Sequence, residues 1–376
     1  MLILSRLACY EMIELLDDPR IDDGAEPGFA RVLERIGEVE NQLEIHMYVW
    51  RNDAIGNEIG EAVLAAAERG VRVLIIKDLG ARLFERTEMN RKPFFPGEVS
   101  ALQRAKYSIV GRTLPDSLVE DDRDWQLGAA VLAHPNVTLR QVEHTHSKFY
   151  VFDERILITG SINIEDRHRG YRDYMVEVCG EEEVGRFRDR LAWGVAYDPS
   201  RPMDFLVNAD RRFEIKPALI ELLGRSRERI YIEMAYIGDP DISRGIIDAS
   251  RRGVEVVILF SRAANIGNDI NYHTLQQVWK ECELKVFLSD KMIHSKLMFF
   301  DDETVVLGSA NLSVFSMHKA VELDLIVRGV PAFLDAVRLA GAHRVGEGQA
   351  VARREDLPGY NRPLAMLQQF HQKAFG

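Results

Sequence analysis

Apolar runs alternate with amphipathic helical stretches along most of the chain. In the first part, the apolar run 43–50 precedes a helical pattern that ends in Ala-Glu-Arg-Gly, and the apolar run 71–78 follows it. In the second part, the run 229–237 precedes a helical pattern ending in Ser-Arg-Arg-Gly, and the run 254–261 follows. Strands that alternate with helices of about 12–15 residues are typical of βαβ units. The pattern predicts an α/β fold with mostly parallel, mixed sheets.

The two parts also share a motif that aligns without a gap. Residues 146–163 read HSKFYVFDERILITGSIN, and residues 294–311 read HSKLMFFDDETVVLGSAN. Both contain His-x-Lys, four residues, Asp, six residues and Gly-Ser-x-Asn. The chain has only 11 lysines, yet both copies place one two residues after the histidine. We interpret the halves as an internal repeat.

The halves differ in length before this motif. From Tyr48 to His146 is 98 residues, whereas from Tyr236 to His294 is 58. The first half therefore carries about 40 additional residues, which we place roughly within 79–135. Connections in compact domains are usually much shorter, so we expect this stretch to be either functional or partly mobile.

We place the boundary between the halves near Asp198. The first repeat then takes residues 1–198, and the second takes residues 199–376 with helices at its C-terminal end. The predicted architecture is two pseudo-symmetric repeats, each a sheet flanked by helices, with the active site at their interface.

The polar residues of the motif suit an anionic tetrahedral centre. Lysine, asparagine and serine side chains can stabilise non-bridging oxygens. One imidazole can attack phosphorus, and the other can donate a proton to the leaving oxygen. A carboxylate bonded to each histidine would orient the ring. The candidates are the catalytic set His146, Lys148, His294, Lys296, Asp173 and Glu322, and the phosphate-binding set Ser161, Asn163, Ser309 and Asn311.

Other roles for polar residues are weaker. His144, His146 and His168 could be metal ligands, but a single His-x-His without cysteine is a weak signal. Since four basic groups already neutralise a phosphate, we expect neither a metal nor another cofactor. Asp153 and Asp301 lie an odd number of residues from the histidines, on the opposite strand face, so we expect them to be structural.

The paired motif resembles that of the phospholipase D superfamily, and the resemblance covers residues 43–327. It implies that His146 is the nucleophile and His294 the general acid, and that Asp153 and Asp301 are structural. Within the superfamily the chain is most similar to bacterial cardiolipin synthases. It departs from them at Ser147, where they commonly have Arg, at Ser161, where they have Gly, and at Ala320, where Asn is often found.

The resemblance implies a phosphatidyltransferase that forms a phospho-histidine intermediate. Its partners would be an anionic, phosphatidylglycerol-like lipid and an alcohol acceptor, at the cytoplasmic face of a membrane. Hydrolysis by water and a nuclease activity are the alternatives, and a binding module without catalysis is a third. The net charge of −11 argues against a broad nucleic-acid surface. The sequence does not indicate an oligomeric state.

Two phenylalanines in the additional stretch allow two interpretations. The segment from Glu85 to Arg112 has six basic residues and three acidic residues, and Phe94 and Phe95 lie between prolines within it. Exposed phenylalanines beside basic residues would favour contact with an anionic membrane. Alternatively, Phe94 and Phe95 pack in the core of the first domain. We interpret Tyr48, Trp50 and Tyr236 as core aromatics.

Overall fold

The computed structural model describes residues 12–16, 27–82, 85, 93–96, 125–265 and 268–366. Within these ranges the chain forms two compact units. The first contains 12–16, 27–169 and 175–185, and the second contains 170–174 and 186–366. The short segment 170–174 thus belongs to the second unit, although it lies between two strands of the first.

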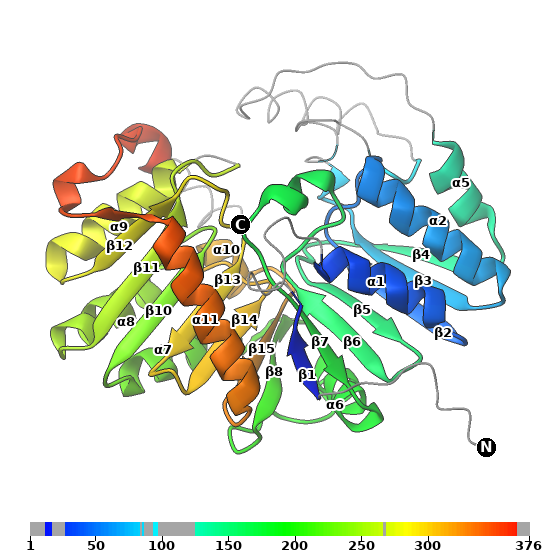
Figure 1. Cartoon of the computed structure of the whole chain (residues 1–376), viewed down its shortest axis with the longest axis horizontal. Helices are drawn as coiled ribbons and strands as arrows, with labels where there is room; N and C mark the ends of the chain where they lie inside the picture. Colours follow the sequence, from blue (N-terminus) through cyan, green and yellow to red (C-terminus); the bar gives the residue numbers. More distant parts are fainter. Residues whose placement is uncertain are drawn as a thin grey trace. The chain divides into compact units, whose positions relative to one another are not determined.

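The first unit is built on a seven-stranded sheet with the order β1-β7-β6-β5-β2-β3-β4 (Figure 1). Its strands are β1 (Ile13–Leu15), β2 (Gln42–Met47), β3 (Arg72–Asp78), β4 (Val137–Val142), β5 (Lys148–Phe152), β6 (Ile156–Gly160) and β7 (Met175–Cys179). The histidine motif therefore begins at β5, in the middle of the sheet.

The second unit has a nine-stranded sheet with the order β16-β12-β11-β10-β13-β14-β15-β8-β9. Its strands are β8 (Met203–Ala209), β9 (Arg212–Phe213), β10 (Arg229–Met234), β11 (Glu255–Ser261), β12 (Lys285–Ser289), β13 (Lys296–Phe300), β14 (Thr304–Gly308), β15 (Glu322–Val327) and β16 (Gln349–Val351). Seven of them, from β8 through β15 to β12, repeat the strand order of the first unit.

Both sheets are mixed, but the parallel share is smaller than the sequence pattern predicts. Among the named strands, only β2–β3, β3–β4, β10–β11 and β11–β12 pair in parallel. The expectation of mostly parallel sheets is therefore wrong. The reason is the tight turn inside each motif, where Asp153–Glu154 and Asp301–Asp302 all have positive φ and fold the chain into an antiparallel hairpin.

The sheet register also corrects one alignment between the halves. β2 ends at Met47, three residues before Trp50, and β10 ends at Met234, three residues before Ile237. Trp50 and Ile237 each form an isolated β-bridge. Trp50 pairs with Ile164 and Ile237 pairs with Leu312, each 18 residues after its histidine. Tyr48 therefore corresponds to Ala235 and not to Tyr236, a shift of one residue from the length comparison above.

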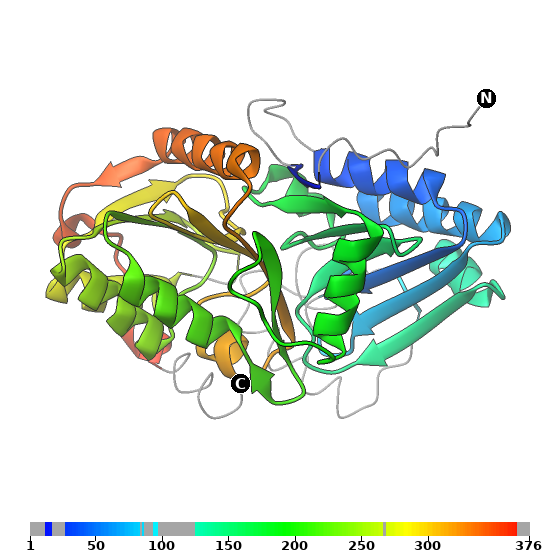
Figure 2. The same cartoon turned by 90° about the horizontal axis from the view of Figure 1, so that it is seen from below.

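Helices cover one face of the first sheet. They are α1 (Pro27–Glu38), α2 (Ala54–Glu68) and α5 (Gln126–Ala133). A further helix, α6 (Glu181–Leu191), comes after β7 in the chain. Apolar side chains of α1, α2, β2 and β3 belong to one core. In Figure 2 the two helices, drawn in blue, lie on the same side of the strands. Asp53 caps the start of α2, and Gly70 follows its end with φ of 99°.

Helices cover both faces of the second sheet. The helices α7 (Ile215–Arg225), α8 (Pro240–Arg251) and α9 (Asp269–Glu281) pack on one face, and α11 (Pro331–Glu347) lies on the other (Figure 2). The short elements are α10 (Val314–His318), η1 (Asp166–Gly170) and η2 (Arg354–Asp356). The repeat is visible again at α8, which Asp239 caps and Gly253 follows with φ of 95°.

None of the helices within the described ranges is both long and apolar enough to span a bilayer.

Candidate functional site

Each repeat places its histidine and lysine at the start of a central strand. His146 comes two residues before the buried Lys148 of β5, and His294 comes two residues before the buried Lys296 of β13. Both lysine Nζ groups donate a hydrogen bond to the carbonyl oxygen of the histidine of the same motif. The lysine therefore holds the backbone of the histidine as well as carrying the positive charge.

A polar residue at the end of the neighbouring strand anchors the residue before each histidine. The Asp78 carboxylate accepts from the Thr145 backbone N–H at 2.9 Å, and the Ser261 hydroxyl accepts from the Ile293 backbone N–H at 2.7 Å. Asp78 ends β3 and Ser261 ends β11. The repeat thus includes an anchor that the sequence comparison missed, although both apolar runs end on a polar residue.

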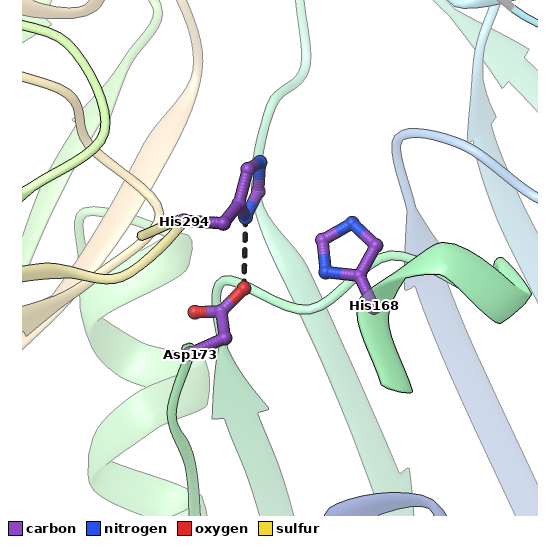
Figure 3. Close-up of side chains that lie close together, drawn as sticks. All are labelled: His168, Asp173 and His294. Atoms are coloured by element: carbon purple, nitrogen blue, oxygen red, sulfur yellow. Dashed lines mark hydrogen bonds and ion pairs between the residues drawn. The ribbon is translucent and has the colours of Figure 1, made fainter. Parts of the chain in front are cut away.

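In the second unit, His294 pairs with Asp173 (Figure 3). His294 Nδ1 donates to Asp173 Oδ2 at 2.8 Å, and both side chains are buried. Figure 3 also labels His168, which belongs to the first unit. The sequence did not determine which carboxylate binds which histidine. In the structure, Asp173 follows the first motif but binds the histidine of the second.

The backbone brings Asp173 to this position. Arg172 forms a β-bridge with Ile293, its N–H donates to the Met292 carbonyl at 2.7 Å, and its own carbonyl accepts from the His294 N–H at 2.8 Å. Segment 170–174 therefore behaves as a short added strand of the second unit, next to the loop that carries His294.

Lys296 completes this cluster. Its Nζ lies 3.1 Å from His294 Nδ1 and 3.3 Å from Nε2. Burial lowers the pKa of Lys296 to about 8, and the negative charges of Asp173 and Glu322 oppose that shift. The ammonium form is therefore retained at neutral pH and can stabilise an anionic phosphate.

Two further carboxyl groups lie on β15. The Ser309 hydroxyl donates to Glu322 Oε2 at 2.5 Å and accepts from the Leu323 N–H at 3.0 Å, so Ser309 holds Glu322 in place. Asp324 Oδ1 accepts from the Ala310 N–H at 3.0 Å. Burial raises the pKa of Asp324 to about 8, and the charge of Glu322 adds to the effect. Asp324 was missed in the sequence, although Glu322-x-Asp324 places two acids on one face of an apolar strand.

In the first unit, His146 is partly exposed and lies against Tyr48. The ring centroids are 4.8 Å apart at an interplanar angle of 67°, and Lys148 Nζ lies 5.2 Å from the Tyr48 centroid. Tyr48 is thus only half-buried and contacts both motif residues, so its assignment to the core is wrong. Trp50, by contrast, is fully buried.

The polar residues after β6 form a buried network in the first unit. Asn163 Nδ2 lies 3.3 Å from Glu165 Oε1, and Glu165 pairs with Arg51, Arg167 and His168 at 2.6 to 2.9 Å. Burial alone would raise the pKa of Glu165, but the charges of Arg167 and Arg51 outweigh it and hold that pKa well below its usual range. Glu165 therefore stays ionised and orients Asn163.

The other two predicted phosphate-binding residues follow the second strand of each motif. Ser161 is buried at the end of β6, and Asn311 is half-buried after β14. A function for Ser161, Asn163, Ser309 and Asn311 in binding phosphate stays a prediction.

The motif aspartates follow the far ends of β5 and β13 from the histidines, beside the starts of β2 and β10. Asp153 accepts from the backbone N–H groups of residues 40–42, and Asp301 accepts from those of residues 227–229. These bonds tie each motif hairpin to β2 or β10. Three backbone bonds to one carboxylate are what a structural residue would make.

Phe94 and Phe95 lie in the core of the first unit. They are 1% and 2% exposed, and both rings pack on Trp50 with centroids 5.0 Å and 5.1 Å from it. Insertion of these two rings into a membrane is therefore ruled out for this conformation. The basic residues predicted to assist them, from Arg86 to Lys92 and from Arg104 to Arg112, lie outside the described residues.

Residues 32–193 and 219–338 match the family model described as cardiolipin synthase, PLD-like domain. The chain is 22% identical over 344 residues to the cardiolipin synthase of Alkalihalophilus pseudofirmus, covering 81% of this chain and 61% of that protein. It is 23% identical over 338 residues to cardiolipin synthase B of Escherichia coli K12, covering 81% and 75%. Thus it spans less than two thirds of the length of the first of these relatives.

Among solved structures, the fold is similar to that of phosphatidylserine synthase from Haemophilus influenzae Rd KW20. The TM-score is 0.70 at 14% identity, over 97% of this chain and 94% of that one. At this identity the likeness establishes the fold, with its two repeats of strands and helices, and no more.

Proposed function

Because the chain belongs to the cardiolipin synthase family of phospholipase D-like domains, we propose that it is a phosphatidyltransferase acting on phospholipid phosphodiesters. The observation that carries this proposal is the buried group formed by His294, Asp173 and Lys296. In this proposal Asp173 holds Nδ1, and Nε2 of His294 exchanges a proton with the substrate. A carboxylate on Nδ1 also stabilises the imidazolium, which is the form that a general acid requires.

In the first step, His146 is the nucleophile. A ring nitrogen of His146 attacks phosphorus, the bond from phosphorus to the leaving oxygen breaks, and His294 Nε2 gives its proton to that oxygen. Lys148 and Lys296 balance the charge on the non-bridging oxygens. The product is a phosphatidyl group on His146 and a free alcohol.

In the second step, the acceptor alcohol takes the place of the leaving group. His294, now neutral, removes the proton from the acceptor hydroxyl while its oxygen attacks phosphorus. The bond from phosphorus to the His146 nitrogen breaks, and both histidines return to their starting protonation states. With water as acceptor the same residues would release phosphatidic acid, so the acceptor decides between transfer and hydrolysis.

The donor in this proposal is an anionic lipid like phosphatidylglycerol, and the acceptor is a lipid or small alcohol at the surface of a membrane. The names of the matched relatives, which are cardiolipin synthases, support this choice of substrates. Lysines at both motifs provide the positive charge that an anionic lipid phosphate requires.

The test is to incubate the purified protein with phosphatidylglycerol vesicles and, separately, with single-stranded DNA. We expect cardiolipin and glycerol from the vesicles and no cleavage of the DNA. His146→Ala and His294→Ala should each abolish lipid turnover. Phosphatidic acid as the sole lipid product would identify a hydrolase, and cleavage of DNA alone would refute the proposal.

The division of labour between the histidines has its own test. With a labelled phosphodiester that has an activated leaving group, His294→Ala should still accumulate a phospho-enzyme, because that leaving group needs no proton. His146→Ala should not. Label found on His294 of the unaltered protein would reverse the assignment.

A further inference from the structure

A buried carboxylate in the second unit collects four hydrogen-bond donors. Glu233 Oε2 accepts from Tyr174 and Tyr231, both at 2.8 Å. Oε1 accepts from the Ser295 hydroxyl at 2.5 Å and from Arg344 Nη1. Glu233 is fully buried, so each of these bonds is shielded from water. The proposed proton transfers do not use this group.

Arg344 connects this carboxylate to the residues of the proposed general acid. Its Nη2 donates to the Asp173 carbonyl at 2.6 Å, and its guanidinium lies 3.8 Å from the Tyr174 ring centroid. Burial would lower the pKa of Arg344, but the charge of Glu233 overcomes it and raises that pKa above the ordinary value. Arg344 is therefore a permanent cation with a fixed partner on each side.

The network holds both members of the His294–Asp173 pair through adjacent residues. Tyr174 follows Asp173 and donates to Glu233, and Ser295 follows His294 and donates to the same carboxylate. One buried ion pair thus fixes the two backbone segments whose side chains must meet at 2.8 Å. Misplacement by about 1 Å can reduce a catalytic rate by about a hundredfold.

This arrangement is specific to the second unit. Met234 of β10 pairs with Lys296, which is two residues after His294, and His46 of β2 pairs with Phe149, which is three residues after His146. Glu233, one residue before Met234, therefore corresponds to His46. His46 instead shares a hydrogen bond of 2.8 Å with the Thr145 hydroxyl. Arg344 also lies beyond residue 338, where the match to the family ends.

We propose that Glu233 and Arg344 are positioning residues that set the geometry between Asp173 and His294, and that α11 thereby supports this pair. This inference rests on the proposed role of His294 as general acid. It predicts that disturbing the network impairs proton donation to the leaving group and leaves nucleophilic attack by His146 intact.

The test compares two substrates in variants of the full chain. Arg344→Lys keeps the charge but loses the two-pronged guanidinium, and Tyr174→Phe removes a single hydroxyl. Each is assayed with phosphatidylglycerol vesicles, whose glycerol leaving group needs a proton, and with a p-nitrophenyl phosphodiester, whose leaving group does not. We expect kcat with the lipid to fall about 10- to 100-fold in Arg344→Lys, and less in Tyr174→Phe. The initial burst of p-nitrophenol release, which reports the attack by His146 alone, should keep a rate within about twofold of the parent.

Arg190→Lys is the matched control. Arg190 is fully buried and binds the carbonyls of Phe205 and Val195 and the carboxylate of Glu214, none of which touches His294 or Asp173 in the described contacts. It should lose neither activity. If Arg344→Lys does not fold, Tyr174→Phe decides by the same ratio of the two rates.

Equal losses on both substrates, or no loss on either, would overturn the positioning role. Failure of the proposed function is a separate result. It would appear as a parent protein without phosphatidyl transfer, or as a His294→Ala variant that still transfers, whatever the Arg344 variant does.

Discussion

Replacing Asp173 by Asn tests the proposed general acid most directly. The substitution keeps the size of the side chain but removes the negative charge that faces His294 Nδ1 at 2.8 Å. The side chains of His294 and Asp173 are 8% and 2% exposed, so solvent screens the pair very little. An imidazolium formed in Asp173→Asn therefore loses most of its stabilisation.

The size of the effect follows from the strength of such a bond. A hydrogen bond to a charged group contributes about 1.5–3 kcal/mol, and about 1.36 kcal/mol corresponds to a factor of ten in rate. We therefore expect kcat for phosphatidyl transfer to fall about 10- to 150-fold. Because the neutral imidazole becomes relatively more stable, the basic limb of the pH–rate profile should move to lower pH.

The assay measures kcat against pH with phosphatidylglycerol vesicles, and the rate of the initial p-nitrophenol burst with a p-nitrophenyl phosphodiester. Asp239→Asn is the control, since Asp239 is a fully buried aspartate of the same unit that pairs with Lys216 at 2.9 Å. It should change stability without changing the pH profile. If Asp173→Asn slows lipid turnover and the p-nitrophenol burst to the same extent, or slows neither, His294 does not act as a general acid supported by Asp173.

Three further predictions concern stability and cofactors. Phe94→Ala should lower the free energy of unfolding of the first unit by about 3–5 kcal/mol in urea titrations, with no change in sedimentation with anionic vesicles; weaker vesicle binding by the folded variant would restore a membrane role. Burial alone would raise the pKa of Asp301, but hydrogen bonds from backbone N–H groups outweigh burial and keep that pKa below its ordinary value. Its stabilisation is therefore present at neutral pH and lost as the pH falls below about 4. Asp301→Asn should flatten this acid dependence of the denaturation midpoint, and an unaltered dependence would contradict it. Turnover should persist in excess EDTA because lysines supply the positive charge, and activity lost in EDTA but restored by a divalent ion would contradict the mechanism.

The sequence alone determined the local elements and the repeat. The run 229–237 contains β10, and the run 71–78 contains β3, because a short, mostly apolar segment bounded by polar turns favours a buried strand. The adjacency of His294 and Lys296 also follows from local geometry, since residues two apart on a strand share a face. These features depend on interactions between near neighbours in the chain.

The direction of the sheets required the structure. A helical pattern between two strands predicts a parallel pair correctly for β2–β3 and β10–β11. The helical pattern does not indicate where the motif strands enter the sheet. Each motif folds into a hairpin at residues with positive φ. The sequence contains no signal that β5 lies beside β2, because that choice depends on which apolar faces pack together.

The partners of the buried charges also required the tertiary structure. Asp173 and His294 are 121 residues apart, and Glu233 and Arg344 are 111 apart. Spacing in the sequence cannot assign such partners, because charges are buried together only where packing excludes water and each finds its counter-charge. For the same reason composition could not place Phe94 and Phe95. Their position beside prolines and basic residues favoured neither a surface nor a core, and the space beside Trp50 is what buries them.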